Sequence, residues 1–264
     1  AGSDFSNVQA NGKKDGDSYI LNGEKMWISL ATVADYAVVT VRTDPKASPS
    51  YRGLKSLLVD LHSPGISRED IHGKLGVRAG STGWINFQDV RVPAKNMIGE
   101  EGEGFKVTMS SFDNGRYTVA AGAVGLIRAC LEESIAYANE REAFGKKLRD
   151  LQLIKAKIAR MSLDYQAARL LYLQAGWMKN QGQRNTRETS SAKWYATDAS
   201  FQAAAEAVQL HGAYGFSDEY NVERYLRNAK GAMIYEGSNE IQRLIQADYA
   251  LGLRRDKPLR KECP

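Results

Sequence analysis

One glutamate offers the chemistry around which this sequence is organised. Glu236 stands directly before Gly237 and just ahead of an apolar-periodic segment. Ser238 or Asn239 can cap a helix at that point, so Glu236 lies at the junction of a loop and a helix. A carboxylate held at such a junction can accept a proton, although most loop glutamates are ordinary solvated charges. The rest of the chain has to decide between these two interpretations.

The composition is that of a globular protein. The chain has 264 residues, of which 43% are hydrophobic and 25% charged, enough for one large or two modest domains with cores of their own. No apolar run is long enough for a membrane helix, and the first residues lack the layout of a signal peptide. The net charge of +5 is spread along the chain. This suits a phosphate-bearing small ligand and gives no basic stripe for nucleic acid.

Few side chains are spaced to hold a metal or to form a disulfide framework. His62, His72 and His211 have no spacing that brings two of them onto one helical face. Cys130 lies in a helical pattern, and Cys263 stands near the C-terminal end. We therefore expect no metal site, no histidine-based triad and no disulfide framework.

The first hundred residues carry the signals of strands and turns. Tyr19–Leu21 and Lys25–Ser29 flank Asn22–Gly23, a pattern that predicts a β-hairpin. Further short strands are predicted over residues 36–41, 54–60, 83–87 and 89–93. Short strands at this spacing predict an antiparallel β-sandwich or barrel.

After a glycine-rich stretch over residues 99–104, the apolar period becomes helical. Helices are predicted over about 105–140, 151–181, 187–210, 219–233 and 239–251. Long helices joined by short turns form a bundle. The predicted fold class is α+β, with an antiparallel sandwich or barrel domain over residues 1–100 followed by a C-terminal four-helix-bundle domain over 101–264.

Four motifs in order, followed by the Glu236 stretch, resemble the acyl-CoA dehydrogenase family. The motifs are Ala1–Asp4, Gly23–Ser29, Glu140–Lys146 and Gln209–Phe216, the last leading to Arg224 and Asn228. Members of this family are flavoenzymes that oxidise acyl-CoA thioesters to 2-enoyl-CoA. They begin with an all-helical domain, and this chain opens inside the motif that normally follows it. We expect a fragment, a processed chain or a subunit whose helical partner is another polypeptide.

The resemblance implies that Glu236 is the catalytic base. It would remove the α-proton of the acyl group while a hydride passes from the β-carbon to flavin N5. Desolvation would raise the basicity of the carboxylate, and the backbone N–H of Glu236 would donate to the thioester carbonyl. Some branches of the family place the base at the position of Gly115, which glycine cannot serve.

The resemblance also assigns residues to the flavin of an FAD cofactor. Trp27, Ile28 and Ser29 match a strand that lies against the isoalloxazine ring, with a hydroxyl like that of Ser29 reaching N5. The ordinary alternative for Trp27 is a tryptophan in a sheet core. Ser238 and Glu240 match positions that touch flavin in relatives, but both residues also suit the start of a helix without any further role.

Further matches lie on the diphosphate and adenine side of FAD, part of them contributed by a neighbouring subunit. These positions are Arg141, Phe144, Gln152, Gln209, Gly212 and Ala213. Relatives often have a second glycine in place of Ala213, so alanine would cost about 1 kcal/mol if that position needs positive φ. Gly212 could equally serve as a helix C-cap.

Four positions match residues that line the CoA and thioester path: Ser3, Asp113, Arg116 and Gly237. Arg116 would suit an anionic ligand. It could instead pair with Asp113, which lies three residues earlier on the same helical face.

The expectation that follows is an FAD-dependent acyl-CoA dehydrogenase that forms a homo-oligomer, a dimer or a tetramer. Electron-transferring flavoprotein is the expected electron acceptor, and the expected compartment is the bacterial cytoplasm or the mitochondrial matrix. Two alternatives stay open. One is a flavin-binding subunit of the same fold without turnover of its own. The other is a relative that reduces enoyl-CoA or passes electrons to oxygen, because the same residues serve both directions.

Overall fold

The structure is a computed structural model that describes residues 1–256. It divides into two compact units, Ala1–Ser111 and Phe112–Pro264. We call them the β unit and the helical unit. Residues 257–264, including Cys263, lie outside the described part of the chain.

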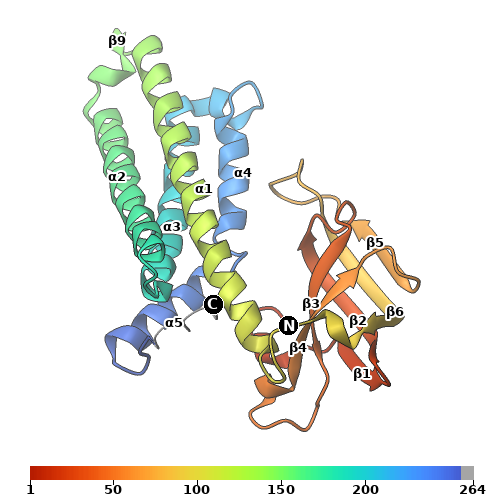
Figure 1. Cartoon of the computed structure of the whole chain (residues 1–264). Coiled ribbons are helices and arrows are strands. Elements are labelled where there is room, and N and C mark those ends of the chain that lie inside the picture. Colours follow the sequence, from red (N-terminus) through yellow and green to blue (C-terminus); the bar gives the residue numbers. More distant parts are fainter. Residues whose placement is uncertain (257–264) are drawn as a thin grey trace. The chain divides into compact units, whose positions relative to one another are not determined.

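The β unit contains one seven-stranded sheet with the order β5-β6-β2-β1-β3-β4-β7 (Figure 1). Neighbouring strands are antiparallel except for β1 and β3, which are parallel. The strands are β1 Asn11–Asp15, β2 Ser18–Ser29, β3 Tyr36–Arg42, β4 Leu54–Asp60, β5 Ile66–Asp70, β6 Thr82–Pro93 and β7 Met97–Ile98. Short 3-10 turns are η1 Phe5–Asn7, η2 Ser50–Gly53 and η3 Ala94–Asn96.

The sheet curls around a single apolar core. Val41 and Leu57 from β3 and β4 belong to the same buried cluster as Ile85, Phe87 and Val90 from β6, near the other end of the strand order. A flat sheet could not bring these strands onto one cluster, so the curled form expected for a sandwich or barrel is confirmed.

The hairpin predicted at Asn22–Gly23 is wrong. β2 runs through this dipeptide as one twelve-residue strand, with a bulge there. The Asn22 amide donates to Asp89 Oδ1 at 2.9 Å and accepts from the Asp89 backbone N–H at 3.0 Å. A Cβ at Gly23 would lie 2.8 Å from Ala10 Cα, so glycine here permits close packing of β2 against the segment just before β1. The actual turn joins β1 to β2 at Asp15–Ser18.

The strands predicted over 83–87 and 89–93 form one strand, β6, with an irregularity opposite Asn22 where Asp89 has φ 51°. Strand β5 was not predicted. Its sequence Ile-Ser-Arg-Glu-Asp contains a single apolar residue, so it lacks the alternation that marks a strand.

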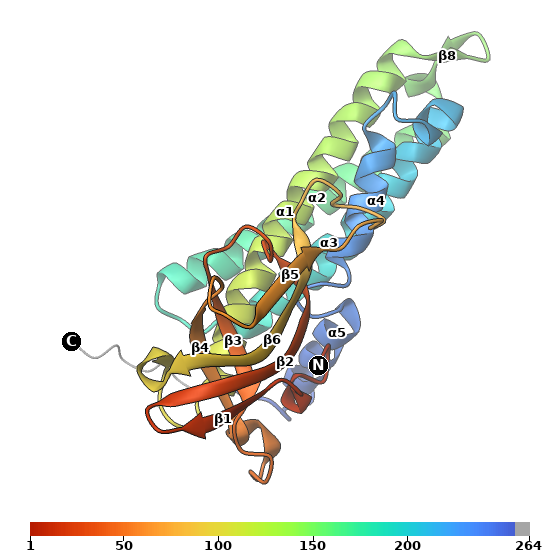
Figure 2. The ribbon, with the colours of Figure 1, turned by 90° about the vertical axis from the view of Figure 1, so that its right-hand side faces the viewer.

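The helical unit confirms the predicted helices to within a few residues. They are α1 Gly104–Glu140, which begins in the β unit, α2 Gln152–Asn180, α3 Thr186–His211, α4 Val222–Ala232 and α5 Asn239–Ala250. The segments α1 to α4 run side by side in both views (Figures 1 and 2). Between them lie the short strands β8 Glu142–Ala143 and β9 Lys146–Lys147 and the turns η4 Leu148–Asp150 and η5 Gly212–Phe216.

The helix α3 forms the centre of the helical unit. Its buried face is lined by small side chains at helical spacing: Ala192, Ala196, Ala199, Ala203 and Ala207. Small side chains let neighbouring helices approach closely, because the side chains at the contact set the distance between helix axes. A second set of buried α3 residues is polar, and it leads to the candidate site.

Candidate active site

The loop between α4 and α5 holds Glu236 in an unusual backbone conformation. Glu236 has φ 55° and Gly237 has φ 83°, so two consecutive residues lie in the left-handed region. For a non-glycine residue this costs roughly 1–2 kcal/mol, which surrounding contacts have to offset. We call residues 233–238 the Glu236 loop. The loop is closed by a hydrogen bond from the N–H of Asn239, the residue after it, to Met233 O at 3.0 Å. Strain held in this way is often found at functional sites.

The Glu236 carboxylate lies against α1 at Gly115, a position without a side chain. A Cβ added at Gly115 would be 2.3 Å from Glu236 Oε2 and 2.7 Å from Cδ. Glycine at this point of the helix therefore makes the space that the carboxylate occupies. Glu236 is nevertheless exposed as a residue, so a ligand can reach it.

The neighbouring Arg116 is buried and forms part of the support of the loop. Its Nε donates weakly to the Glu236 carbonyl at 3.4 Å, and its Nη1 donates to Asp113 Oδ1 at 3.1 Å. Asp113 Oδ2 in turn accepts a hydrogen bond from Thr186 Oγ1 at 2.8 Å. The alternative for Arg116, a pairing with Asp113, is thus present. Contact of either residue with a substrate stays a prediction.

The surroundings of Glu236 favour a stronger base than an ordinary carboxylate. Desolvation raises the pKa of the Glu236 carboxyl above its usual range, while the positive charges of Arg116 and Lys193 act in the opposite direction. Desolvation prevails. A carboxylate that is ionised yet poorly solvated is suited to remove a proton from carbon.

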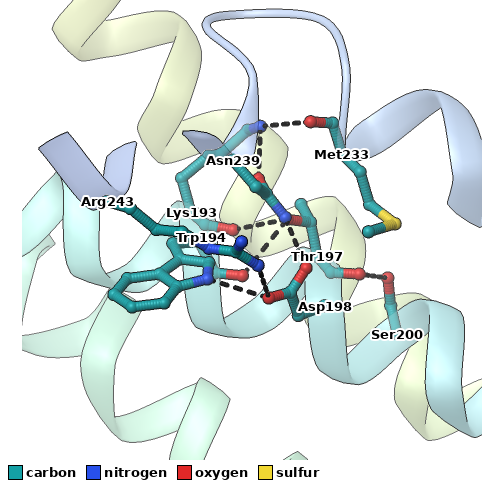
Figure 3. A network of polar contacts seen from close by, with 8 residues as sticks. All are labelled: Lys193, Trp194, Thr197, Asp198, Ser200, Met233, Asn239 and Arg243. Carbon is teal, nitrogen blue, oxygen red and sulfur yellow. Dashed lines mark hydrogen bonds and ion pairs between the residues drawn. The ribbon is translucent and has the colours of Figure 1, made fainter. Parts of the chain in front are cut away.

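Lys193 on α3 is the residue at this site that sequence reasoning missed. It is completely buried, and its ammonium donates to Gly237 O and Asn239 Oδ1, both at 2.8 Å, and more weakly to Met233 O at 3.4 Å. Figure 3 shows Lys193 in the polar network that joins α3 to the start of α5. A signal was present, because a polar stripe at helical spacing interrupts the alanine-rich face of α3: Thr186, Ser190, Lys193, Thr197 and Ser200.

The position of Asn239 in this network is fixed from both sides. Thr197 Oγ1 donates to Asn239 Oδ1 at 3.0 Å, and Asn239 Nδ2 donates to Asp198 Oδ1 at 2.7 Å. Asp198 Oδ2 also accepts from Trp194 Nε1 at 2.8 Å and from Arg243 at 3.3 Å (Figure 3). The amide oxygen of Asn239 therefore has to face Lys193.

The other predicted residues near Glu236 lie in the loop or at the start of α5. Ser238 stands at the N-cap position of α5 without a side-chain capping bond, and Glu240 lies in the first turn of that helix. A Cβ at Gly237 would lie 2.7 Å from Gln242 Nε2, so glycine is required by both its conformation and its packing. Four of the predicted residues, namely Asp113, Arg116, Glu236 and Gly237, thus form one cluster.

In the β unit, Trp27 lies at a bulge of β2 between Met26 and Ile28, with φ 63° and 64% of its surface exposed. The alternative that placed this tryptophan in a sheet core is wrong, since Ile28 packs against the core instead. Ser29 is exposed beside it, as is Ser3 near the start of the chain. A bulge that turns an aromatic ring outward is typical of a ligand-binding edge.

A second group of predicted residues lies far from Glu236 within the helical unit. Arg116 and Arg141 are separated by about seven turns of α1, roughly 37 Å. Phe144 and Gly145, both with positive φ, form the turn between β8 and β9, and the Phe144 side chain is 90% exposed. Gln152 begins α2 and is exposed. These residues cannot contact a ligand held at Glu236 of the same helical unit unless that ligand is very long.

In the turn after α3, Gly212 has positive φ and Ala213 does not. Gly212, with φ 63°, caps α3, and its N–H donates to Gln209 O. Ala213 follows in η5 and is not among the residues with positive φ. Alanine therefore adds no backbone strain at this position, and the departure from the glycine of many relatives costs little.

Two classes of site are absent from residues 1–256. No helix in this range is long and apolar enough to cross a membrane. Across the same residues, no group of histidine, cysteine, aspartate and glutamate side chains is arranged to hold a metal ion.

Comparison with known proteins agrees with this geometry. Residues 1–90 match the model of the acyl-CoA dehydrogenase middle domain, and residues 102–251 match that of the acyl-CoA dehydrogenase C-terminal domain. A probable acyl-CoA dehydrogenase of Bacillus subtilis is 40% identical over 94% of this chain and 65% of its own length. A subunit of the caffeyl-CoA reductase–Etf complex of Acetobacterium woodii is 38% identical over 93% of this chain and 64% of its own.

A solved structure shows the same likeness. Butyryl-CoA dehydrogenase from Megasphaera elsdenii superimposes with a TM-score of 0.92 at 39% identity, covering 95% of this chain and 65% of that one. This chain thus spans less than two thirds of the length of these relatives. The matched domains, their order and the level of identity place the chain in the acyl-CoA dehydrogenase family.

Proposed function

We propose that this chain carries the catalytic base and part of the FAD site of an acyl-CoA dehydrogenase. The observation that carries the proposal is the Glu236 carboxylate, which is held by a strained loop against the bare backbone of α1 at Gly115. Glu236 is exposed as a residue, and the basicity of its carboxyl group is raised. Both are needed to remove the weakly acidic proton beside a thioester carbonyl.

Glu236 takes the α-proton of the acyl chain onto a carboxylate oxygen. As the proton leaves, negative charge develops on the thioester oxygen, where the backbone N–H of Glu236 donates a hydrogen bond. Gly237 lets the backbone after Glu236 pack against Gln242, which helps to hold the loop in place. Bound FAD supplies the acceptor for the β-hydride, and the protein contributes its position and electrostatics.

The residues present fit such a cofactor. Trp27 exposes its indole at a bulge, and Phe144 exposes nearly its whole ring on a hairpin turn. Large aromatic groups without partners of their own suit a flat aromatic ligand. We propose flavin contacts at Trp27, Ile28 and Ser29 in the β unit. In the helical unit, we propose them at Ser238 and Glu240.

The predicted residues that lie far from Glu236 bring a second copy of the chain into the proposal. Arg141 lies about 37 Å along α1 from Arg116, which contacts the Glu236 loop, so we do not assign it to the cofactor at Glu236 of the same helical unit. We assign Arg141, Phe144, Gln152, Gln209, Gly212 and Ala213 to the diphosphate and adenine end of the FAD held by a neighbouring copy. This assignment requires a homo-oligomer.

The direction of electron flow has two candidates. Dehydrogenation with an electron-transferring flavoprotein as acceptor is the first. The likeness to a subunit of a caffeyl-CoA reductase–Etf complex favours enoyl-CoA reduction as the second. Both directions use Glu236. Its carboxylate removes the α-proton in dehydrogenation, and its protonated form returns that proton in reduction.

The test is an anaerobic absorption spectrum of the purified chain, supplied with FAD and then with a panel of saturated acyl-CoAs. Bleaching of the flavin band by one of them is the expected result, and it begins to identify the acyl group. A chain that binds FAD but is not reduced by any acyl-CoA or oxidised by any enoyl-CoA would favour a subunit without turnover. A colourless preparation would move the search to a partner domain.

The raised pKa of Glu236 predicts a pH dependence. Only the ionised carboxylate acts as a base, so the rate of flavin reduction should rise with pH until Glu236 is fully ionised. Because desolvation raises the pKa of Glu236, this rise should be centred above the usual range of a glutamate. Stopped-flow reduction from about pH 4, below the usual pKa of a glutamate, to about pH 9 measures it. A rate that is constant across this range would contradict the prediction.

A further inference from the structure

We propose that Lys193 is a positioning residue for the catalytic base, because it fixes the carbonyl groups of the Glu236 loop and places a positive charge beneath that loop. The proposal rests on the function proposed above, in which Glu236 is the base. Lys193 itself touches neither the carboxylate nor, in this proposal, the substrate. It acts through the backbone of the loop and through its charge.

The contacts of Lys193 all lie on the loop or at its end. An ammonium group has three N–H donors, and those of Lys193 go to Gly237 O, Asn239 Oδ1 and Met233 O. The side chain is completely buried, so water cannot replace a lost partner. A loop that left this conformation would leave a buried cation unpaired, which is among the costliest defects in a protein interior.

The two acceptors at 2.8 Å are themselves held in place. Gly237 O also accepts from Gln242 Nε2 at 2.9 Å, so α3 and α5 hold the same peptide group. Asn239 cannot turn its amide, because Thr197 and Asp198 fix both ends of it. The peptide next to Glu236 is thereby fixed without any contact to the carboxylate, which stays available for chemistry.

The charge of Lys193 acts on Glu236 as well. Burial lowers the pKa of Lys193 to about 8, so the ammonium is still charged at neutral pH. The charged groups facing it are Arg116 on α1, Asp198 on α3, Glu236 on the loop and Glu240 on α5. Arg116 and Lys193 are the two cations that lower the pKa of Glu236 and partly offset its desolvation. Losing one of them should leave the carboxyl group protonated to a higher pH.

The experiment measures the pKa of the Glu236 carboxyl by carbon-13 NMR in the full chain, with the signal assigned by its loss in Glu236→Gln. Lys193→Met keeps a side chain of similar length without the charge. It should raise the pKa of Glu236 by about one unit, a tenfold change in its acid constant. Ile127→Ala is the control, since Ile127 is buried in α1 about 16 Å beyond Arg116. It should lower stability and leave this pKa unchanged.

A reciprocal measurement decides the matter even if Lys193→Met does not fold. Coupling between two titrating groups is symmetric, so Glu236→Gln should lower the pKa of Lys193 by the same amount. An unchanged Lys193 pKa in Glu236→Gln would overturn the proposal, as would an unchanged Glu236 pKa in a folded Lys193→Met. A lysine that only stabilised the fold would show no such coupling.

Kinetics separate this proposal from the one on which it rests. In Lys193→Met, the pH profile of flavin reduction should move to higher pH by the same tenfold factor, while Ile127→Ala keeps the profile of the unchanged protein. Undiminished reduction in Glu236→Gln would end the proposed function and leave the measured coupling intact. Absence of coupling would end the role of Lys193 while Glu236 remained the base.

Discussion

Glu236→Gln is expected to bind FAD as before and to be reduced by acyl-CoA at least about a thousandfold more slowly. The amide keeps the shape of the carboxyl group, so it leaves the loop and its contacts in place. It cannot accept the α-proton, because an amide is a far weaker base than a carboxylate. Anaerobic stopped-flow reduction with the best acyl-CoA of the panel measures the rate, and the flavin spectrum measures binding.

Glu219→Gln is the matched control for this prediction. Glu219 is exposed in the segment before α4, so the same chemical change is made at the far end of that helix from the Glu236 loop. The control should be reduced at the original rate. If Glu236→Gln were reduced equally fast, another group would be the base and the proposed function of Glu236 would have to be abandoned.

Gly115→Ala is expected to slow flavin reduction by about a hundredfold without lowering the stability of the fold. Two effects compete in this substitution. Alanine in place of glycine favours a helix interior by about 1 kcal/mol. The new Cβ, however, would lie 2.3 Å from Glu236 Oε2, so one of the two has to move. The carboxyl group is the free end of a flexible side chain and moves more easily than the helix backbone.

Displacement by about 1 Å is enough to explain the expected loss, since misplacing a reacting group by that distance can cost on the order of a hundredfold in rate. Gly122→Ala is the control on the same helix, because a Cβ there meets nothing within 4 Å. It should gain the same helix propensity and keep its rate. Thermal unfolding and stopped-flow reduction of both variants provide the comparison. Equal rates of flavin reduction in Gly115→Ala and Gly122→Ala would mean that the position of the Glu236 carboxylate against α1 is not needed for the reaction.

The helices could be predicted from the sequence because their signal is local and repeated. Each long helix carries many turns of apolar periodicity, and glycines such as Gly182 and Gly212 mark where it ends. The error at Asn22–Gly23 has the opposite origin. That dipeptide is bound through Asn22 to Asp89, 67 residues later, and a local pattern cannot distinguish such a bulge from a turn.

The candidate site was predictable in part for the same reason. Glu236 and Gly237 are adjacent in the sequence and could be recognised together. Lys193 was harder to recognise, because a lysine in a helical pattern is usually exposed and its partners follow 40 to 46 residues later. Only the polar stripe on α3 pointed to it. The sequence also does not show that Arg116 and Arg141 stand about 37 Å apart on one helix axis, which requires knowing that α1 is unbroken.

The missing side chain at Gly115 also has an evolutionary consequence. Its Cβ position and the Glu236 carboxylate claim the same volume, so a base can enter this space from α1 or from the Glu236 loop, but not from both. We therefore expect a relative with its base at the position of Gly115 to differ from this chain by a coupled exchange at both positions. Filling one position first crowds two carboxyl groups together, and emptying the other first removes the base. Either order would pass through a form in which the base is crowded or missing, so we expect the two changes to occur together.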